Sequence, residues 1–371
     1  MIPMQALDLF AGTGWGVALQ ARGIREGGVE IMPEAQASRA AAGMETIYSD
    51  VWHGLLGDDP RRFWHALQIA SPPCQPFSLS GKGAGRAALD DVLRAIVTGA
   101  YRRPERLRAL GAETDDRTAL VLTPLAHVYR DRPLWVTWEQ VPPVLPVWEA
   151  CAEELRAMGY SVWVGIIRAE QFGVPQARRR AVLIARADGI EAAPPTPTHS
   201  RFYERENDRL DEGVLPWVTM ADALGWELSS RPSPTITGGG TETGGAEPIA
   251  KLARYTSRPD WVFRRPATTV VADPRLGGPG RSEFVKGGIS RQNRPGSLRI
   301  EAHEAAKLQS YPDGFHFAGG LGKQFLQIGN AVPPLMAGAI IDELIAPAAH
   351  RPAPALEKTP ALAAGGERQV A

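Results

Sequence analysis

The sequence predicts an α/β protein, in which a sheet covered by helices on both faces is accompanied by a smaller, irregular region. Strand-like and helical patterns alternate through the first half of the chain. A glycine-rich turn joins the first of these strands to the first helix. Proline and glycine crowd a later stretch, as in Ala193–Pro197 and Thr237–Gly240, which is typical of loops on short strands.

Composition sets the limits of this interpretation. A chain of 371 residues with 44% apolar content can bury one large core and a smaller domain. Two cysteines argue against a disulfide framework and fit a reducing compartment. No charged-then-apolar leader precedes Asp8, and no run of about 18 apolar residues indicates a membrane span. We therefore expect a cytoplasmic protein that does not bind membranes.

The first three predicted strands lead to candidate ligand-binding residues. Strand Ala6–Leu9 is followed by the turn Phe10–Gly14 and the helical stretch Val17–Arg22. Glycines let the backbone approach a ligand at the head of a helix, and an acid after the next strand can hold a ribose hydroxyl. Glu30 is that acid. The pattern predicts a nucleotide-type pocket, although a glycine turn alone fits a surface turn equally well.

A second acid follows the predicted strand Ile47–Ser49. Asp50 stands at the end of this strand, where its carboxylate could contact the ligand of that pocket. The same residue type in the same place is equally typical of the N-cap of a helix. The sequence leaves both interpretations of Asp50 open.

One of the two cysteines lies in a turn braced by prolines. The predicted strand Ala66–Ser71 leads into Pro-Pro-Cys-Gln-Pro-Phe, in which Pro73 and Pro76 flank Cys74. Prolines fix φ, so this thiol has little conformational freedom, and a cysteine thiolate is a strong nucleophile near neutral pH. A buried structural cysteine is the alternative. Cys151 lies on the apolar face of the predicted helix Val147–Met158, where core packing explains it.

Asp-Leu-Phe-Ala-Gly followed by Pro-Pro-Cys-Gln-Pro-Phe resembles the DNA (cytosine-5)-methyltransferase family. The family's further motifs occur in its order, over about residues 6 to 345. They are Trp138–Val141 (the family's Glu-Asn-Val), Gln171–Arg180 (its Gln-x-Arg-x-Arg element, before strand Ala181–Ala185), Ala305–Pro312 and Gln327–Pro334. Gln140 replaces the asparagine that the family usually has after the glutamate.

The resemblance implies a Rossmann-like sheet of the S-adenosylmethionine-dependent methyltransferases and a smaller target-recognition domain. Residues 1–186 and 298–346 would form the catalytic domain, 187–297 the recognition domain, and 347–371 a disordered, Ala- and Pro-rich tail. Residues 251–300 hold eleven Lys and Arg against three acids, which suits phosphate contacts. Within the recognition region we expect a short helix in Trp217–Trp226. Arg231–Thr237 echoes Arg264–Val271, through equivalent strands or by coincidence.

Cytosine C5 is too electron-poor to attack a methyl group until a nucleophile adds to C6. The resemblance assigns this attack to Cys74, and a proton shared near N3 to Glu139. Arg178 and Arg180 are the candidates for a guanidinium at O2, with Arg180 the stronger for contact with the base. Taken singly, Glu139 also fits a surface acid and the arginines a solvated basic turn. A cytosine in a duplex must be extruded from the stack before this chemistry.

The resemblance also implies that S-adenosyl-L-methionine binds and leaves as S-adenosyl-L-homocysteine, and that no metal is required. The implied cofactor-binding residues are Phe10, Ala11, Gly12, Thr13, Gly14, Glu30, Asp50, Pro72, Pro73, Asn330 and Ala331. The glycine-containing loop of residues 78–86 is expected to close over DNA. Residues 86–114 lengthen this loop beyond the family's pattern, without an assigned role.

These observations predict an enzyme that methylates cytosine at C5 in a specific sequence of double-stranded DNA, through a covalent bond between Cys74 and C6. It is expected to act as a monomer in a prokaryotic or phage-infected cell, associated with the nucleoid through DNA, with any cognate restriction endonuclease acting separately. A branch with the same motifs that methylates transfer RNA, and a catalytically silent DNA-binding relative, remain alternatives. The long basic region favours duplex DNA.

Overall fold

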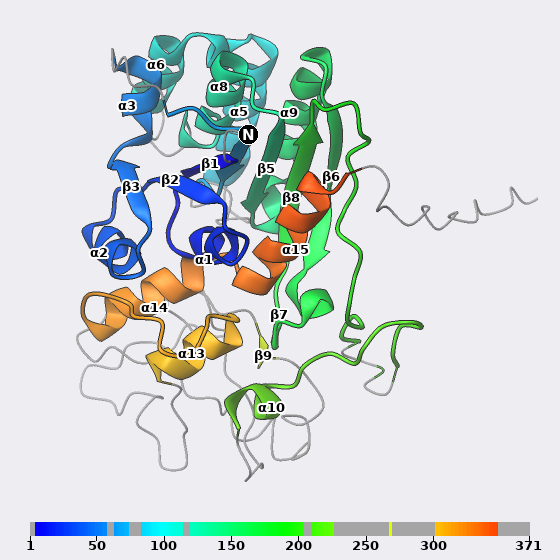
Figure 1. Ribbon diagram of the computed structural model, residues 1–371. Coiled ribbons are helices and arrows are strands. Elements are labelled where there is room, and N and C mark those ends of the chain that lie inside the picture. The colour runs from blue at the N-terminus through cyan, green and yellow to red at the C-terminus, as the bar shows by residue number, and fades with distance from the viewer. Residues whose placement is uncertain are drawn as a thin grey trace, which may run out of the picture.

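The computed structural model describes residues 4–57, 63–73, 83–113, 119–203, 206, 209–225, 267–268 and 301–347. Its central feature is a seven-stranded sheet (Figure 1). The strands of this sheet are β1 (Gln5–Leu9), β2 (Arg25–Val29), β3 (Glu45–Tyr48), β4 (Leu67–Ala70), β5 (Trp135–Gln140), β6 (Ser161–Arg168) and β8 (Arg179–Arg186). A second, two-stranded pair consists of β7 (Gln176–Ala177) and β9 (Ala267–Thr268).

The strands lie in the order β3-β2-β1-β4-β5-β8-β6. All pairs from β3 to β5 are parallel, whereas β8 runs antiparallel to both β5 and β6. Strands β1 and β4 are adjacent in space although β2 and β3 come between them in the chain. This reversal of strand order is the position at which open α/β sheets bind ligands.

Helices cover both faces of the sheet. The helices are α1 (Gly14–Gln20), α2 (Pro33–Ala41), α3 (Val51–Leu56), α5 (Gly83–Val97), α6 (Pro104–Glu113), α8 (Thr123–Asp131), α9 (Leu145–Ala157), α10 (Met220–Leu224), α13 (Ala302–Leu308), α14 (Leu321–Asn330) and α15 (Pro334–Ile345). Short 3₁₀ turns are η1 (Ala100–Arg102), η2 (Pro142–Val144) and η3 (Ala169–Phe172).

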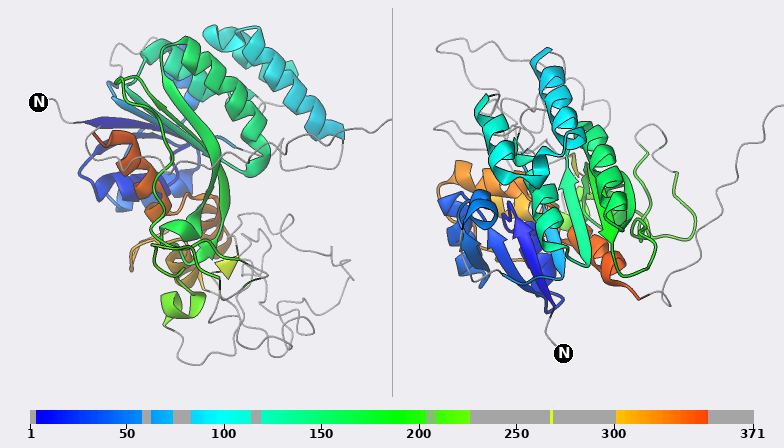
Figure 2. Two further views of the ribbon diagram at one scale, coloured as in Figure 1. Left: turned by 90° about the vertical axis from the view of Figure 1, so that its right-hand side faces the viewer. Right: turned by 90° about the horizontal axis from the view of Figure 1, so that it is seen from above.

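Figure 2 shows α1 and α15 on one face of the sheet and α5 and α9 on the other. Each face has its own apolar core. The core on the α1 and α15 side includes Trp15, Ile69 and Ile340, and the opposite core includes Trp138, Trp148 and Cys151. Burial of Cys151 among these residues confirms its role in core packing. A third cluster, around Tyr311 and Phe325, lies under the C-terminal helices α13 and α14.

Local sequence explains where several of these helices begin. The Asp50 carboxylate accepts a hydrogen bond from the Trp52 N–H at 3.0 Å and so caps α3. Helix α13 begins with a reciprocal capping box between Glu301 and Glu304. Helix α2 has Pro33 in its first turn, where a missing N–H costs nothing.

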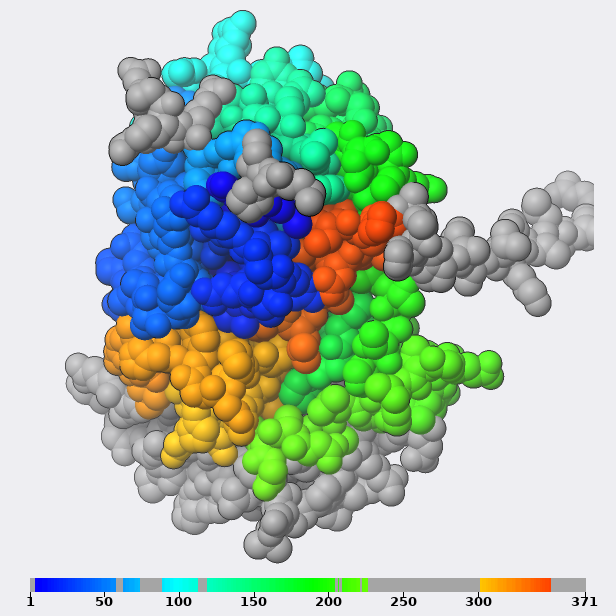
Figure 3. Space-filling model, in the orientation of Figure 1, coloured from blue at the N-terminus to red at the C-terminus, as the bar shows by residue number. Residues whose placement is uncertain are grey.

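The C-terminal segment packs back onto the start of the chain. In Figure 3, the segment with α14 lies directly beside the N-terminal region, α13 lies below α14, and α15 lies between the N-terminal region and the later strands. A Cβ built on Gly14 would lie 2.0 Å from the Val332 carbonyl oxygen, so only glycine allows this approach. The Thr13 and Tyr311 hydroxyls are hydrogen bonded at 2.6 Å, and Ser38 donates to Gln327 at 2.6 Å.

The predicted α/β sheet with helices on both faces is confirmed. The expected short helix in Trp217–Trp226 appears as α10. Residues 83–113 differ from the prediction of a lengthened loop, because they form α5, η1 and α6. The residues Leu89, Val92 and Ile96 recur at helical spacing and pack into the core on the α9 side, and this burial outweighs the helix-weakening glycines.

Several predictions lie outside the described residues. They are those for Cys74, most of the loop 78–86, the stretch Arg231–Thr237, the tail from 348, and most of 187–297. Among described residues, one stretch, Leu321–Ile345, is long and apolar enough to span a membrane. It comprises α14 and α15 with a break between them, and 67% of an apolar 18-residue window within it is buried inside the fold. It is therefore explained as a core element.

Gly14→Ala should lower the free energy of unfolding by about 1–3 kcal/mol, because its methyl group would meet backbone rather than a movable side chain. Urea denaturation measures this difference. Gly320→Ala is the matched control, since a Cβ there meets nothing within 4 Å. Equal stability of the Gly14→Ala variant and the wild type would contradict the close packing of Gly14 against the Val332 backbone.

Candidate active site

The candidate site follows from the direction of the strands. Because β1 to β5 are parallel, their carboxyl ends meet at one edge of the sheet. This edge holds the predicted turn Phe10–Gly14 after β1, Glu30 after β2, Asp50 after β3 and Pro72 with Pro73 after β4. Residues predicted from four separate segments are thus brought together along one edge.

The turn after β1 leaves open space and fixes Glu30. Phe10 and Gly12 both have positive φ, at 60° and 48°, and a Cβ built on Gly12 would meet nothing within 4 Å. The Gly12 N–H donates to one Glu30 carboxylate oxygen at 2.8 Å, and the Met32 N–H donates to the other at 2.8 Å. Each oxygen keeps a second lone pair that can accept from a ligand hydroxyl.

Asp50 is the N-cap of α3, so the helix-capping interpretation of this residue is confirmed. Only one carboxylate oxygen is used in the cap. Its other oxygen makes no hydrogen bond to a described residue and can accept one from a ligand amine. An open glycine turn flanked by two acids at neighbouring strand ends therefore fits a nucleoside cofactor such as S-adenosylmethionine.

A buried ion pair lies farther along the same edge. Glu139 pairs with Val182 between β5 and β8, so Arg180, two residues before Val182, projects from the same face of the sheet. Arg180 Nε lies 2.7 Å from Glu139 Oε1, and the two side chains are only 10% and 5% exposed. Glu139 stands inside β5 and Arg180 inside β8. The antiparallel direction of β8 places Arg180 at the carboxyl edge.

Gln140 ties the strand with Glu139 to the turn that precedes Cys74. Its side-chain N–H donates to the Pro72 carbonyl, and its carbonyl oxygen accepts from the Val141 N–H. Cys74 itself lies outside the described residues, one peptide beyond Pro73. The longer amide of this chain thus supports the proline turn through a direct hydrogen bond.

Arg178 is placed differently from Arg180. It is 1% exposed, and its Nη1 donates to the Gly329 carbonyl at 3.1 Å, so it contacts the last motif of the chain. Nearby, the Gln176 amide donates to Gln309 Oε1 at 2.9 Å, and Gln309 donates to the Ile328 carbonyl at 2.5 Å. These bonds hold the C-terminal return in place. Within that return, Ala331 is buried and Asn330 is exposed.

One contact links the predicted recognition region to the arginine element. Strand β9 pairs in parallel with β7, which places Ala267 beside Gln176 and Thr268 beside Ala177. Residues 267–268 belong to the stretch Arg264–Val271 that the sequence singled out. The described part of this stretch therefore lies beside Gln176 and Ala177, which come just before Arg178 and Arg180 in the chain.

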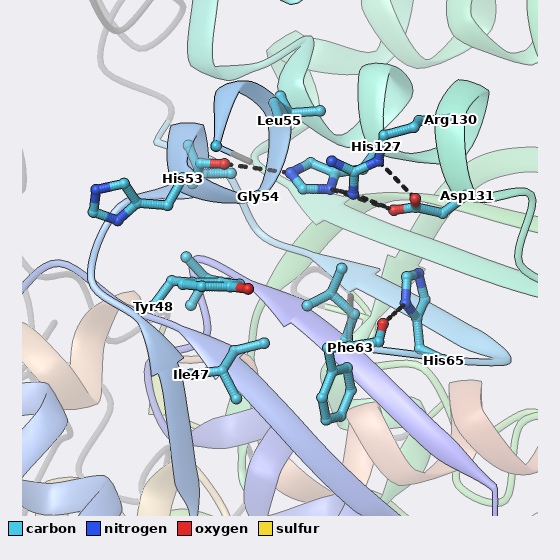
Figure 4. A pocket seen from close by; sticks show the side chains of 14 residues that line it. Ile47, Tyr48, His53, Gly54, Leu55, Phe63, His65, His127, Arg130 and Asp131 are labelled. Atoms are coloured by element: carbon cyan, nitrogen blue, oxygen red, sulfur yellow. Dashed lines mark hydrogen bonds and ion pairs between the residues drawn. The ribbon is translucent and has the colours of Figure 1, made fainter. Parts of the chain in front are cut away.

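A cavity of about 100 Å³ lies between α3, α8 and the sheet (Figure 4). Its polar lining includes His65, His127 and Asp131. Burial lowers the pKa of both imidazoles, which favours their neutral forms. His65 Nδ1 lies 3.0 Å from the Phe63 carbonyl and His127 Nε2 lies 3.4 Å from that of Val51. None of the predicted site residues lines this cavity.

Sequence reasoning missed several residues that build the site. Tyr311, Gln176 and Gln309 stood inside quoted motifs, and the presence of polar side chains among apolar neighbours was the available signal. Arg39 and Glu26 stood in no motif. Each is a charged residue on the inward face of a helix or strand. This position can be recognised only when the register of the strand or helix is known.

Comparison with known proteins agrees with this arrangement. The family model for C-5 cytosine-specific DNA methylases matches residues 111–346, more than half of the chain. The chain belongs to this family. Its members are named for methylation of cytosine at C5 in DNA, and residues 8–12 and 72–73, the described parts of the two motifs that carried the resemblance, lie at the sheet edge described above.

Individual proteins similar to this chain are also named as methyltransferases. The type II methyltransferase M1.HphI of Haemophilus parahaemolyticus is 28% identical over 75% of this chain and 67% of its own length. The type II methyltransferase M.AplI of Arthrospira platensis is 27% identical over 90% of this chain and 83% of its own length. The S. pombe Dnmt2 methyltransferase structure, with a TM-score of 0.56 and 18% identity, covers 92% of this chain and 98% of its own, and shows the fold alone.

Gln140→Glu should lower the methyl-transfer rate by about ten- to a hundredfold, because a carboxylate in place of the donating amide would face the Pro72 carbonyl. Steady-state assays with labelled cofactor measure this rate. Gln140→Asn keeps the amide and restores the family's usual residue, so its loss should be smaller. A Gln140→Glu enzyme as active as Gln140→Asn would show that this hydrogen bond does not support the turn.

Proposed function

We propose that this methylase transfers the methyl group of S-adenosylmethionine to C5 of cytosine within a specific sequence of double-stranded DNA. The observation that carries the proposal is the buried Glu139 and Arg180 pair beside the Pro72-Pro73 turn, on the same edge as the glycine turn. An acid and a guanidinium held together near Pro72 and Pro73, which precede Cys74 in the chain, suit a reaction on a pyrimidine ring.

The chain's own residues divide the chemistry between them. The Cys74 thiolate adds to C6, so an S–C bond forms and the electrons of the C5–C6 double bond become available at C5. Glu139 shares a proton with N3 as negative charge spreads over the ring, and Arg180 donates to O2. When bound, S-adenosylmethionine would supply the electrophilic methyl group for C5, with S-adenosylhomocysteine as the leaving group. A base then removes the C5 proton, and the S–C6 bond breaks to restore the double bond and release Cys74.

Arg180 has a second role because it pairs with Glu139. Its Nε lies 2.7 Å from Glu139 Oε1, and this ion pair fixes the position of the acid. Arg178, bonded to Gly329, instead anchors the C-terminal return against the arginine element. We assign direct contact with the base to Arg180 and a supporting position to Arg178.

The cofactor is proposed to bind along the glycine turn. Glu30 would accept from the ribose hydroxyls and Asp50 from the adenine amine, with Phe10, Ala11, Gly12, Thr13 and Gly14 forming the floor of the site. Pro72 and Pro73 would separate cofactor from base. Asn330 and Ala331 would close the site, which is supported by the packing of the neighbouring Val332 against Gly14.

Residues 187–297 are proposed to read the DNA sequence, and the pairing of β9 with β7 supports their position beside the arginine element. The target cytosine would be flipped out of the duplex into the site. The similarity to type II methyltransferases supports a place in restriction and modification, with a monomeric methylase acting on cytoplasmic DNA and any endonuclease acting separately.

Bisulfite sequencing of DNA from a methylation-free host expressing the wild-type chain or Cys74→Ala tests this function. We expect protected cytosines in one short sequence context, and none in the variant. Transfer RNA from the same cells is sequenced in parallel. Protection in transfer RNA alone would replace DNA as the substrate, and protection in neither would indicate a silent binder.

Arg180→Lys should lower kcat by on the order of 100-fold, because lysine keeps the charge but loses the planar fork that binds Glu139. Single-turnover methyl transfer on the identified site measures the effect. Arg179→Lys, at the exposed neighbouring position, is the matched control and should stay within about threefold of wild type. Equal losses in both variants would argue for a general charge effect.

A further inference from the structure

Two carboxylic acids and one guanidinium are buried together beneath the glycine turn. Asp8 and Arg39 are fully buried, and Glu26 is 6% exposed. Arg39 Nη2 lies 2.9 Å from Glu26 Oε1. None of these three residues has a part in the proposed methyl transfer, and their burial is costly unless they perform a function or stabilise one another.

The strand register explains how the three side chains meet. Strands β1 and β2 pair Ala6 with Glu26 and Asp8 with Gly28, so both acids project from the same face of the sheet. A Cβ built on Gly28 would lie 1.9 Å from Arg39 Nη2. The guanidinium therefore lies directly over Gly28, in the space that the side chain of any other residue would occupy.

From this position Arg39 reaches three different segments. Its Nε donates to Thr46 Oγ1 at 3.0 Å and its Nη2 to the Glu45 carbonyl at 2.8 Å, both on β3. Its Nη1 donates to the Gly12 carbonyl at 2.9 Å. One side chain thus connects β2, β3 and the glycine turn.

The bond to Gly12 decides which way the turn faces. The described peptide bonds are all trans, so the Thr13 N–H points opposite to the Gly12 carbonyl and away from Arg39. On its other side, the Gly12 N–H donates to Glu30. Arg39 and Glu30 together hold both peptide groups that flank Gly12.

The charges of this cluster do not balance if both acids are ionised. The charged groups that act on Asp8 are Glu26 on β2, Arg39 on α2, and Glu30, which follows β2. The nearest part of α1 is the uncharged Gly16, and β3 presents Thr46 and the Glu45 carbonyl. Burial, and then the charge of Glu26, raise the pKa of Asp8. Burial also raises the pKa of Glu26, although Arg39 opposes this.

The hydrogen bonding of Asp8 leads to the same conclusion. Neither of its carboxylate oxygens has a donor among the described residues. A proton on one carboxyl of the pair would supply that donor, with the other carboxyl as acceptor. The cluster would then hold one negative and one positive charge.

We propose that Arg39 is a positioning residue for the cofactor, held in place by Asp8 and Glu26, which share one proton, and acting through the Gly12 carbonyl to orient the glycine turn. This inference rests on the proposed function, because it takes that turn as the cofactor site. Arg39 does not touch the reacting atoms, so it governs binding of the cofactor rather than the chemical step.

Arg39→Lys tests the positioning role, because lysine keeps the charge but cannot reach β3, Glu26 and Gly12 together. We expect the Kd for S-adenosylhomocysteine, measured by calorimetry on the full chain, to rise by about tenfold or more. KM for S-adenosylmethionine should rise in parallel, while kcat at saturating cofactor stays within about twofold. Arg25→Lys, which alters the exposed ion pair with Glu45 on the same strands, is the matched control.

Glu26→Gln tests the shared proton and is the milder change. The glutamine amide can donate to an ionised Asp8 and its oxygen can accept from Arg39, so the charges balance without a proton. We expect the infrared carbonyl band of a protonated carboxylic acid, present in the wild type at neutral pH, to decrease in Glu26→Gln by one carboxyl equivalent. Arg25→Lys should leave this band unchanged.

The outcomes separate this inference from the proposed function. The positioning role alone would be overturned if the wild type binds S-adenosylhomocysteine and Arg39→Lys binds it equally well. The same conclusion would follow if Arg39→Lys loses kcat but keeps its affinity. An unchanged infrared band in Glu26→Gln would overturn the shared proton, and this variant decides the matter if Arg39→Lys does not fold. A wild type that binds neither S-adenosylmethionine nor S-adenosylhomocysteine would overturn the proposed function, and this inference with it.

Discussion

The contact of Val332 with Gly14 joins the C-terminal helices to the turn after the first strand, and the rest of the site depends on this contact. Nothing larger than a hydrogen at Gly14 leaves room for the Val332 carbonyl. Around this contact, Thr13 bonds to Tyr311 across 298 positions of sequence, and Arg178 bonds to Gly329. The turn after the first strand, the arginine element and the last motif consequently form one packed unit. A change in any of them is transmitted to the others, since close-packed interiors relax only partly.

Burial controls the strength of the polar contacts along the sheet edge. Glu139 and Arg180 are both nearly inaccessible to water, so the loss of one partner would leave the other as an uncompensated buried charge. The same holds for Asp8, Glu26 and Arg39 one layer below the glycine turn. The edge therefore depends on matched donors, acceptors and charges, whereas the two apolar cores hold the sheet and its helices together.

Local patterns carried much of the prediction. The glycine turn, Glu30 and Asp50 were placed correctly at successive strand ends, because strand, turn and helix signals are read within a few residues. Residues 86–114 were predicted to lengthen the loop of residues 78–86, because they exceed the family's usual pattern. Residues 83–113 form helices because Val92 and Ile96 find partners on α9's side of the sheet, and a local pattern does not reveal such partners.

The sequence by itself determined the family, the order of the motifs and the residue types available for chemistry, because each depends on short stretches of chain. Tertiary structure decided which of these residues meet. The antiparallel register of β8 with β5 brings Arg180 to Glu139, and the register of β1 with β2 places Asp8 and Glu26 under one arginine. Register and strand direction are set by long-range pairing and by burial of a whole face. For that reason no single segment of the sequence specifies them.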